Sequence, residues 1–330
     1  MDPASGSMQP EAPRGERPAD ERGGPRRRGR LLAVAAVTLA VLLAGHRLVP
    51  RALGAGGLLE SFLPWLGLAV PVLALVALWR RAPWAGLALV LPAAVWSALF
   101  GPALLADHGG QGNGDLRVVT HNLRFVNPDV RGSAAALLRV RPDLLALQEV
   151  NPAGRPALAA VLDPALRYHA LHGRSGLWSR YPIREPRWIT VGPGQRSVLR
   201  AVVAAPGGPL AVWVAHPPRL RLGVAQPRDA ELRRLARAVA ADPVPRLLLV
   251  GDLNTASTDR ALGPLERRLR SAQVDAGSGL GFTWPAPMPL MRIDHVFYRG
   301  LGAVDAWVLG RTGSDHRAVL ADLRTTTGPS

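Results

Sequence analysis

The sequence of 330 residues predicts an α/β fold with mixed sheets covered by helices, preceded by three transmembrane helices. Two observations carry this prediction. The chain is strongly apolar between Leu31 and Leu105, and after Asp115 short strand-like runs alternate with helical ones. Adjacent strand runs also occur in the second part, which favours mixed sheets over a purely parallel barrel. We therefore expect a membrane segment followed by one α/β domain.

The composition changes along the chain and predicts four regions. Residues 1–30 are rich in Pro, Gly and charge and end in an arginine cluster, which is typical of a disordered basic tail. Residues 31–106 form the apolar segment. Residues 107–115 are polar and glycine-rich, as expected of a linker. Residues 116–330 form the α/β domain.

Three runs in the apolar segment, Leu31–Val49, Leu58–Trp79 and Trp84–Leu105, are each near the length of about 20 residues that crosses a bilayer as a helix. The middle run contains Pro64 and Pro71, which membrane helices tolerate better than soluble ones do. Two alternatives stay open: a buried helical domain of a soluble protein, and a cleaved signal peptide for the first run.

The arginines predict the orientation of these helices. Arg26, Arg27, Arg28 and Arg30 precede the first run, and Arg80 and Arg81 separate the second from the third. The positive-inside rule places both groups in the cytoplasm. With three spans, the α/β domain then lies outside the cytoplasm, on a multi-pass protein of the cell membrane. With two spans, the orientation inverts.

Charge and cysteine content exclude some functions. The net charge is +16, but all the basic residues are Arg, so the excess is a weak indication of a nucleic-acid ligand. The chain contains no Cys, which excludes disulfides, thiolate catalysis and Cys-ligated metals.

Polar side chains occur at the ends of several predicted strands after Asp115. In open α/β sheets, binding sites lie at strand ends, so these side chains are expected to converge on one site. They are Asn122, Glu149, His216, Asp252 with Asn254, Asp294, and Asp315 with His316.

The residue types indicate phosphoester hydrolysis. Carboxylates and amides suit Mg²⁺ or Mn²⁺. Asp252 could orient and deprotonate an attacking water, Asn254 could donate to a phosphoryl oxygen, and a carboxylate such as Asp294 could fix the tautomer of His316. The alternatives are a solvated Glu149, an Asx turn at Asp252 and a structural histidine. Neither a P-loop nor a nucleophile elbow occurs, which favours direct attack by water.

Seven motifs together resemble the endonuclease/exonuclease/phosphatase superfamily, over about Asp115–Leu323. The resemblance implies a four-layer α/β sandwich, two sheets flanked by helices, and divalent-metal-dependent cleavage of phosphoesters. In chain order the motifs are "THNLRF", "PDLLALQEV", "GLWSRYPI", "VWVAHPP", "LVGDLNT", "RIDHVF" and "SDHRAVLADL".

The resemblance also implies roles for individual residues. Glu149 would be the principal metal ligand, with Asn122 and Asp315 assisting. Asp252 would position the nucleophilic water, and Asn254 would contact the phosphate. His316, backed by Asp294, would act as acid/base or stabilise the transition state, and His216 would hold the scissile phosphate.

With three spans ahead of the domain, the chain resembles a membrane-anchored actinobacterial branch of that superfamily, which includes the teicoplanin-resistance protein of the vancomycin-resistance J type. This resemblance suggests a surface phosphatase for a lipid-linked cell-wall phosphate and a role in glycopeptide resistance. One alternative is an extracellular, membrane-tethered nuclease or phosphodiesterase. Another is an inactive membrane-anchored binding or sensor protein. No obligate protein partner is expected.

Overall fold

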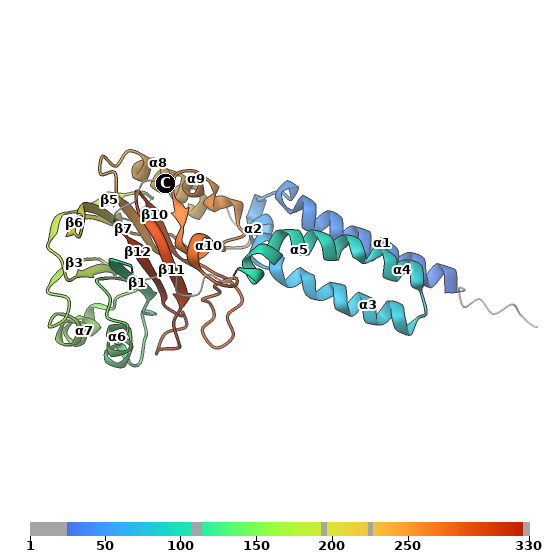
Figure 1. The fold of residues 1–330 in the computed structure, drawn as a ribbon, viewed down its shortest axis with the longest axis horizontal. Helices are drawn as coiled ribbons and strands as arrows, with labels where there is room; N and C mark the ends of the chain where they lie inside the picture. The colour runs from blue at the N-terminus through green and yellow to red at the C-terminus, as the bar shows by residue number, and fades with distance from the viewer. Residues whose placement is uncertain (1–24, 107–113, 193–196, 224–226, 326–330) are drawn as a thin grey trace, which may run out of the picture.

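A computed structural model describes residues 25–106, 114–192, 197–223 and 227–325. Most of the predicted tail and most of the predicted linker lie outside these residues. Figure 1 shows two parts: a group of helices that run side by side, and an α/β domain at one end of them.

The N-terminal part is helical throughout its length, apart from short turns. Its first helix, α1, begins at Pro25, six residues before the predicted start at Leu31. Proline is favoured in the first turn of a helix and arginine is a good helix former, so "PRRRGR" extends the helix backwards. The elements are α1 (Pro25–Gly45), η1 (His46–Leu48), η2 (Ala52–Gly54), α2 (Ala55–Ser61), η3 (Leu63–Leu68), α3 (Ala69–Trp79), α4 (Pro83–Ala88) and α5 (Val90–Leu105).

The expectation of three transmembrane helices needs correction in the middle one. Gly29–Leu48 and Pro83–Leu105 are long and apolar enough to cross a membrane. The middle run is bent by 60° between Ala52–Ser61 and Leu63–Trp79. Two prolines explain why it is not one regular α-helix. Each lacks an amide hydrogen, and the ring of a helical proline clashes with the carbonyl four residues before it. Pro64 is the second residue of the 3₁₀-helix η3, and Pro71 lies in the first turn of α3.

The α/β domain contains two six-stranded sheets, and both are mixed, as predicted. In each sheet one pair of neighbouring strands is parallel, β1 with β2 and β7 with β8, while the other pairs are antiparallel. The first sheet has the order β11 (Gly302–Val308), β12 (Val319–Arg324), β1 (Leu116–Asn122), β2 (Leu144–Gln148), β4 (Ser175–Ser179), β3 (Tyr168–His172). The second has the order β5 (Ile183–Thr190), β6 (Ser197–Ala205), β7 (Gly208–Val214), β8 (Leu247–Asp252), β10 (Asp294–Arg299), β9 (Arg270–Ser271).

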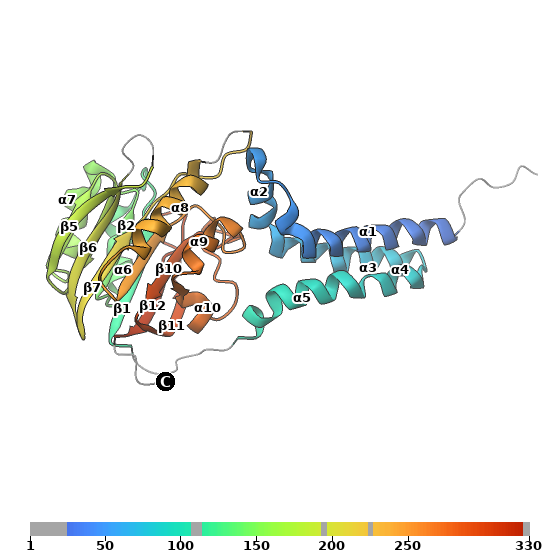
Figure 2. The same ribbon diagram turned by 90° about the horizontal axis from the view of Figure 1, so that it is seen from above.

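Helices cover the outer faces of the two sheets, which confirms the α/β sandwich (Figure 2). Leu137 of α6 (Val130–Leu138) and Leu158 of α7 (Arg155–Leu162) pack on the first sheet. Leu235 of α8 (Pro227–Ala240) packs on the second, together with Leu265 of α9 (Gly263–Glu266). A third apolar cluster fills the space between the sheets. The described residues of the domain also form the short helices η4 (Pro152–Gly154), η6 (Arg260–Leu262) and α10 (Ala272–Ala276).

Candidate active site

The parallel strand pairs bring four of the predicted residues to one edge of the sandwich. Asn122 ends β1 and Glu149 directly follows β2. Asp252 ends β8, and His216 lies just after β7. The carboxyl ends of parallel neighbours lie at the same edge of their sheet. Each sheet therefore delivers two polar side chains.

Two further residues reach this edge from antiparallel strands. Asp294 begins β10 and is the register partner of Asp252 in β8. His316 precedes β12, whose first residue, Val319, pairs with Thr120 near the end of β1. A strand that runs antiparallel to its neighbour starts where the neighbour ends, so both side chains enter the same site.

Contacts connect the residues of the two parallel pairs. The Asn122 amide Nδ2 donates to Asp252 Oδ2 at 2.9 Å. His216 Nε2 lies 3.5 Å from Asp252 Oδ2 and 3.6 Å from Glu149 Oε1. His216 therefore lies between the two carboxylates, one from each sheet.

His316 connects the two carboxylates of the second sheet. Its Nδ1 donates to Asp294 Oδ2 at 3.0 Å, and its Nε2 lies 3.8 Å from Asp252 Oδ2. Burial alone would lower the pKa of His316, but the negative charges of Asp294 and Asp252 raise it to about 9. The ring is therefore an imidazolium at neutral pH, and Nε2 remains as the donor that faces the site.

Asp252 and Glu149 are held ionised by their neighbours. Burial opposes ionisation of Asp252, but the charges of His316 and His216 and the Asn122 hydrogen bond bring its pKa well below its usual range. Burial likewise opposes ionisation of Glu149. The Phe125 amide, which donates to Oε2 at 2.9 Å, and the charge of His216 outweigh burial and lower the pKa of Glu149.

Asn254 and Asp315 lie differently from the other six predicted residues. The Asn254 backbone amide donates to Asp252 Oδ1 at 2.8 Å, with a left-handed φ of 48° that asparagine tolerates. Its side-chain Nδ2 donates to the Pro217 carbonyl at 3.0 Å, so it joins the loop of His216. The Asp315 carbonyl accepts from the Ala286 amide at 2.7 Å. Within the described part of the chain, the Asp315 carboxylate makes no hydrogen bond or ion pair.

Sequence reasoning missed two residues that hold the site together. Ser314 Oγ donates to the Asn122 carbonyl at 2.6 Å and accepts from the His316 amide at 3.0 Å. A serine two residues before the histidine is a signal for such a turn. Arg219 Nη2 lies 3.3 Å from Glu149 Oε1, and its side chain is 69% exposed. In the sequence, the only sign of this contact is that Arg219 lies three residues after His216.

Two sets of groups could hold a divalent cation. Ligand atoms of Asp252, Asp294 and His316 all lie within 4.8 Å of one another. In this set, however, Asp294 Oδ2 already accepts from His316 Nδ1, and Asp252 Oδ2 accepts from Asn122 Nδ2. Glu149 fits better, because its Oε1 has only the longer contacts of Arg219 and His216. Asn122 lies beside it, and its Oδ1, which accepts from the Arg124 amide at 2.9 Å, has a second lone pair that could bind the same cation. Carboxylate and amide oxygens are the ligands that Mg²⁺ and Mn²⁺ prefer.

Comparisons with known proteins identify the family and the fold. Residues 119–316 match the Endonuclease/Exonuclease/phosphatase family. No curated protein sequence matches the chain significantly.

Several solved structures share the fold. TDP2 from D. rerio in complex with a single-strand DNA product has 20% identity and a TM-score of 0.53, over 64% of this chain and 99% of that one. A family protein from Leptotrichia buccalis has 15% identity and a TM-score of 0.52, over 63% and 99%. An endonuclease/exonuclease/phosphatase from Beutenbergia cavernae has 22% identity and a TM-score of 0.50, over 64% and 72%. Because the family match covers more than half of the sequence, the chain belongs to the Endonuclease/Exonuclease/phosphatase family.

Proposed function

We propose that the chain is a divalent-metal-dependent phosphoester hydrolase, anchored in the membrane by its N-terminal helices. Members of its family are generally phosphoester hydrolases. The observation that carries the proposal is the convergence of acids, an amide and histidines from both sheets on one edge of the sandwich. They are Asn122, Glu149, His216, Asp252, Asp294 and His316.

In this proposal each charged group has one role. The Asp252 carboxylate accepts a hydrogen bond from the attacking water and orients it. The carboxylate then takes the proton that the water loses as the new P–O bond forms, and its low pKa keeps it ionised for this step at neutral pH. His316 donates from Nε2 to a phosphoryl oxygen and stabilises the negative charge that develops there, while Asp294 keeps the ring charged. Stabilisation is thus favoured over acid/base catalysis for His316. His216, between Glu149 and Asp252, holds the scissile phosphate.

Glu149 and Asn122 would hold the cation, Mg²⁺ or Mn²⁺, and the role of Asp315 in this site remains a prediction. A bound divalent ion neutralises phosphoryl oxygens and lowers the pKa of water. Asn254 would contact the phosphate with the amide hydrogen that does not face the Pro217 carbonyl.

The arrangement of the helices supports an extracytoplasmic domain. The Gly279 amide donates to the Ala103 carbonyl near the end of α5, and the Gly223 amide donates to the Leu53 carbonyl after α1. Arg80 and Arg81 lie between α3 and α4, at the end of the helices far from the domain (Figure 1). If the helices cross a membrane, these arginines and the domain lie on opposite sides. The positive-inside rule then places the domain outside.

We further propose a phosphate of a lipid-linked cell-wall intermediate as the substrate. A lipid phosphate is confined to the surface from which the domain projects, so its local concentration there is high. Glycopeptide resistance would follow from such an activity, and antibiotic sensitivity of cells that lack the enzyme would test it. A tethered nuclease is the second candidate, because TDP2 from D. rerio, which shares this fold, is found with a single-strand DNA product.

The full-length protein in detergent tests these proposals. Hydrolysis of undecaprenyl pyrophosphate, bis-nitrophenyl phosphate and plasmid DNA would be measured with Mg²⁺ or Mn²⁺. We expect phosphate release from the lipid, its loss in Asp252→Asn, and its retention in Glu185→Gln, which removes an exposed carboxylate on β5. Plasmid nicking without lipid turnover would support the nuclease. Full activity of a folded Asp252→Asn protein would exclude catalysis by this site.

A further inference from the structure

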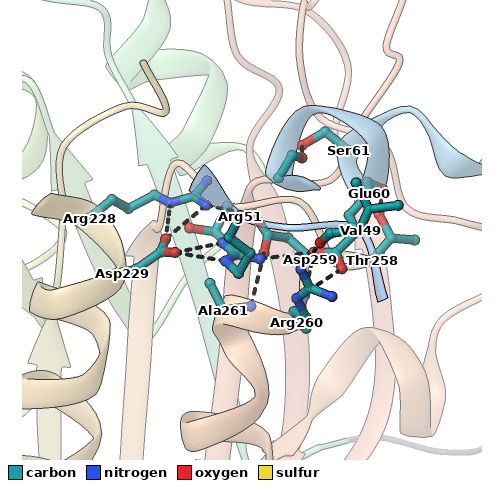
Figure 3. A network of polar contacts seen from close by, with 12 residues as sticks. Val49, Arg51, Glu60, Ser61, Arg228, Asp229, Thr258, Asp259, Arg260 and Ala261 are labelled. Carbon is teal, nitrogen blue, oxygen red and sulfur yellow. Dashed lines mark hydrogen bonds and ion pairs between the residues drawn. The ribbon is translucent and has the colours of Figure 1, made fainter. Parts of the chain in front are cut away.

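The chain between α1 and α3 contacts the α/β domain through a buried network of ions (Figure 3). Arg51 is its centre on the N-terminal side. Its guanidinium donates to Asp229 Oδ2 at 2.8 Å, to Asp259 Oδ1 at 2.7 Å and to Glu60 Oε2 at 2.9 Å. Asp229 belongs to α8 and Asp259 directly precedes η6, so Arg51 joins elements that are far apart in the sequence.

Arg228 completes this network from the domain side. It donates to Asp229 Oδ1 at 3.0 Å and to Asp259 Oδ2 at 2.6 Å. Each aspartate therefore binds one arginine through each of its two oxygens, and the four side chains form a closed ring. The side chains of Arg228 and Asp259 are 1% and 0% exposed, and that of Arg51 is 23% exposed. Charges buried to this degree are stable only when they are fully paired.

The ring is in contact with the loop that carries the candidate catalytic groups. Arg228 Nη1 donates to the Asn254 carbonyl at 3.0 Å. Asn254 in turn donates its backbone amide to Asp252 and its side-chain amide to Pro217, one residue after His216. The position of Arg228 therefore affects two of the loops that form the site.

Packing around the ring leaves little room for movement. A Cβ atom on Gly57 of α2 would lie 3.3 Å from Asp259 Oδ2 and 3.4 Å from Arg228 Nη2. Glu60 at the end of α2 is fully buried and binds both Arg51 and Arg260. The short helix α2 of the N-terminal part therefore packs directly against the side chains of the ion ring.

We propose that Arg51 is a positioning residue for the active site: through the ring with Asp229, Asp259 and Arg228 it holds the 252–259 loop in its catalytic conformation. The inference rests on the proposed hydrolase function and adds to it. The N-terminal segment then has a part in catalysis as well as in anchoring. Without Arg51, Asp229 and Asp259 have only Arg228 as a shared positive partner among the described residues. We expect the Arg228 guanidinium to shift toward them and away from the Asn254 carbonyl.

The test uses the full-length protein in detergent with Mn²⁺ and bis-nitrophenyl phosphate. This small soluble substrate removes any effect of membrane access. Arg51→Ala is compared with Arg47→Ala, an exposed arginine of the same connection. We expect kcat to fall by about tenfold or more in Arg51→Ala, because small displacements of reacting groups are costly. Arg47→Ala should stay within about twofold of the wild type.

Amide hydrogen exchange gives a second readout that does not need activity. In Arg51→Ala, exchange should accelerate in residues 252–261, while β1 and β2 of the other sheet stay protected. If Arg51 only attaches the helices to the domain, the melting temperature falls but kcat and exchange in residues 252–261 stay at their wild-type values. That result would overturn the inference.

Arg51→Lys decides the question if Arg51→Ala does not fold. Lysine keeps the charge but lacks the planar fork that reaches Asp229, Asp259 and Glu60 together. A lower kcat with faster exchange in the loop supports positioning, and wild-type values for both contradict it. If the wild type hydrolyses none of the substrates, the proposed function fails, and the exchange measurement alone decides the inference.

Discussion

Two clusters of buried carboxylates in this chain differ in how their charge is balanced. The network around Arg51 contains Glu60, Asp229 and Asp259, which meet Arg51, Arg228 and Arg260 in short ion pairs. The active-site cluster contains Glu149, Asp252 and Asp294, whose charged partners among the described residues are His216, His316 and the exposed Arg219.

This difference in charge balance suggests that the first cluster contributes mainly to stability and the second mainly to activity. Three acids with three arginines form a set of charges that is balanced by the chain alone. In the active-site cluster the positive charges come from two imidazoles and from Arg219, whose side chain is 69% exposed, so a cation or the donors of a substrate can take the place of these partners. Perturbed carboxylates with unused binding capacity are typical of functional sites. Variants of the first cluster should therefore change stability most, and variants of the second should change activity most.

The largest expected effect is on the rate of hydrolysis. Asp252→Asn should lower kcat by about 10³-fold, within the range for loss of a catalytic proton acceptor. The free energy of unfolding should fall less than in a variant of the Arg51 network, because the loss of the contacts of Asp252 with His316 and Asn122 is partly offset by the removal of repulsion between Asp252 and Asp294. Steady-state kinetics and thermal unfolding measure the two effects. A strongly destabilised Asp252→Asn protein would place this residue with the structural cluster.

The matching substitution in the Arg51 network should have the opposite pattern. Asp259→Asn removes a buried carboxylate that pairs with both Arg51 and Arg228. Because buried positive charge is then left uncompensated, the free energy of unfolding should fall by about 3 kcal/mol. The melting temperature in detergent should fall by several degrees. An unchanged melting temperature would show that solvent reaches the ring and screens it.

Divalent cations should stabilise the protein through the active-site cluster only. At a concentration about 100 times the dissociation constant, Mg²⁺ or Mn²⁺ should add about 2.7 kcal/mol. Glu149→Gln should abolish this gain, and Glu60→Gln, a matched change outside the cluster, should keep it. Thermal unfolding with added metal or with chelator makes the comparison. If Glu149→Gln is still stabilised by the metal, residues other than Glu149 bind it.

Acid should weaken the Arg51 network. Burial would raise the pKa of Asp259, but the charge of Arg228 and the hydrogen bond from Arg51 hold it below its ordinary value near 3.8. The stability from this group is therefore complete above pH 3.8 and is lost as the pH falls through the lower, folded-state pKa. Unfolding midpoints measured from pH 5 down to pH 2 should run parallel above pH 3.8 and, below it, should fall less steeply in Asp259→Asn than in the wild type. Curves that stay parallel below pH 3.8 would contradict this assignment.

The smallest effect is expected for Arg219, whose pair with Glu149 is exposed to solvent. Arg219→Ala should change stability by less than about 1 kcal/mol. Its contribution to substrate binding should weaken with salt, so KM of wild type and variant should converge at high ionic strength. A loss of kcat at all salt concentrations would give Arg219 a direct part in the reaction.

Much of the candidate site could be predicted from the sequence because strand ends are visible in it. Asn122, Glu149 and Asp252 each follow an apolar run, and a run of that kind indicates a buried strand. Their common edge then follows from the parallel pairing of β1 with β2 and of β7 with β8. The same reasoning predicted mixed sheets covered by helices.

Other features depend on side-chain directions that a strand pattern does not determine. Asn254 shares a motif with Asp252, yet its left-handed backbone turns the amide toward Pro217. Glu60 was part of the predicted middle span, but in the structure it binds Arg51 and Arg260 against the domain. Nothing local to Glu60 indicates partners so distant in the sequence.

The same distance in sequence has a consequence for the order of events during synthesis. Arg51 and Glu60 are nine residues apart, and their pair can form soon after both leave the ribosome. The other partners of Arg51 come 178 and 208 residues later. Contacts of such separation form late in folding. The newly made helices therefore carry Arg51 and Glu60 without their final partners until the loop around Asp259 has been translated and folded. In a chain that stops earlier, these charges stay unpaired with the domain, and such exposed charges mark the chain as incomplete to quality-control proteases.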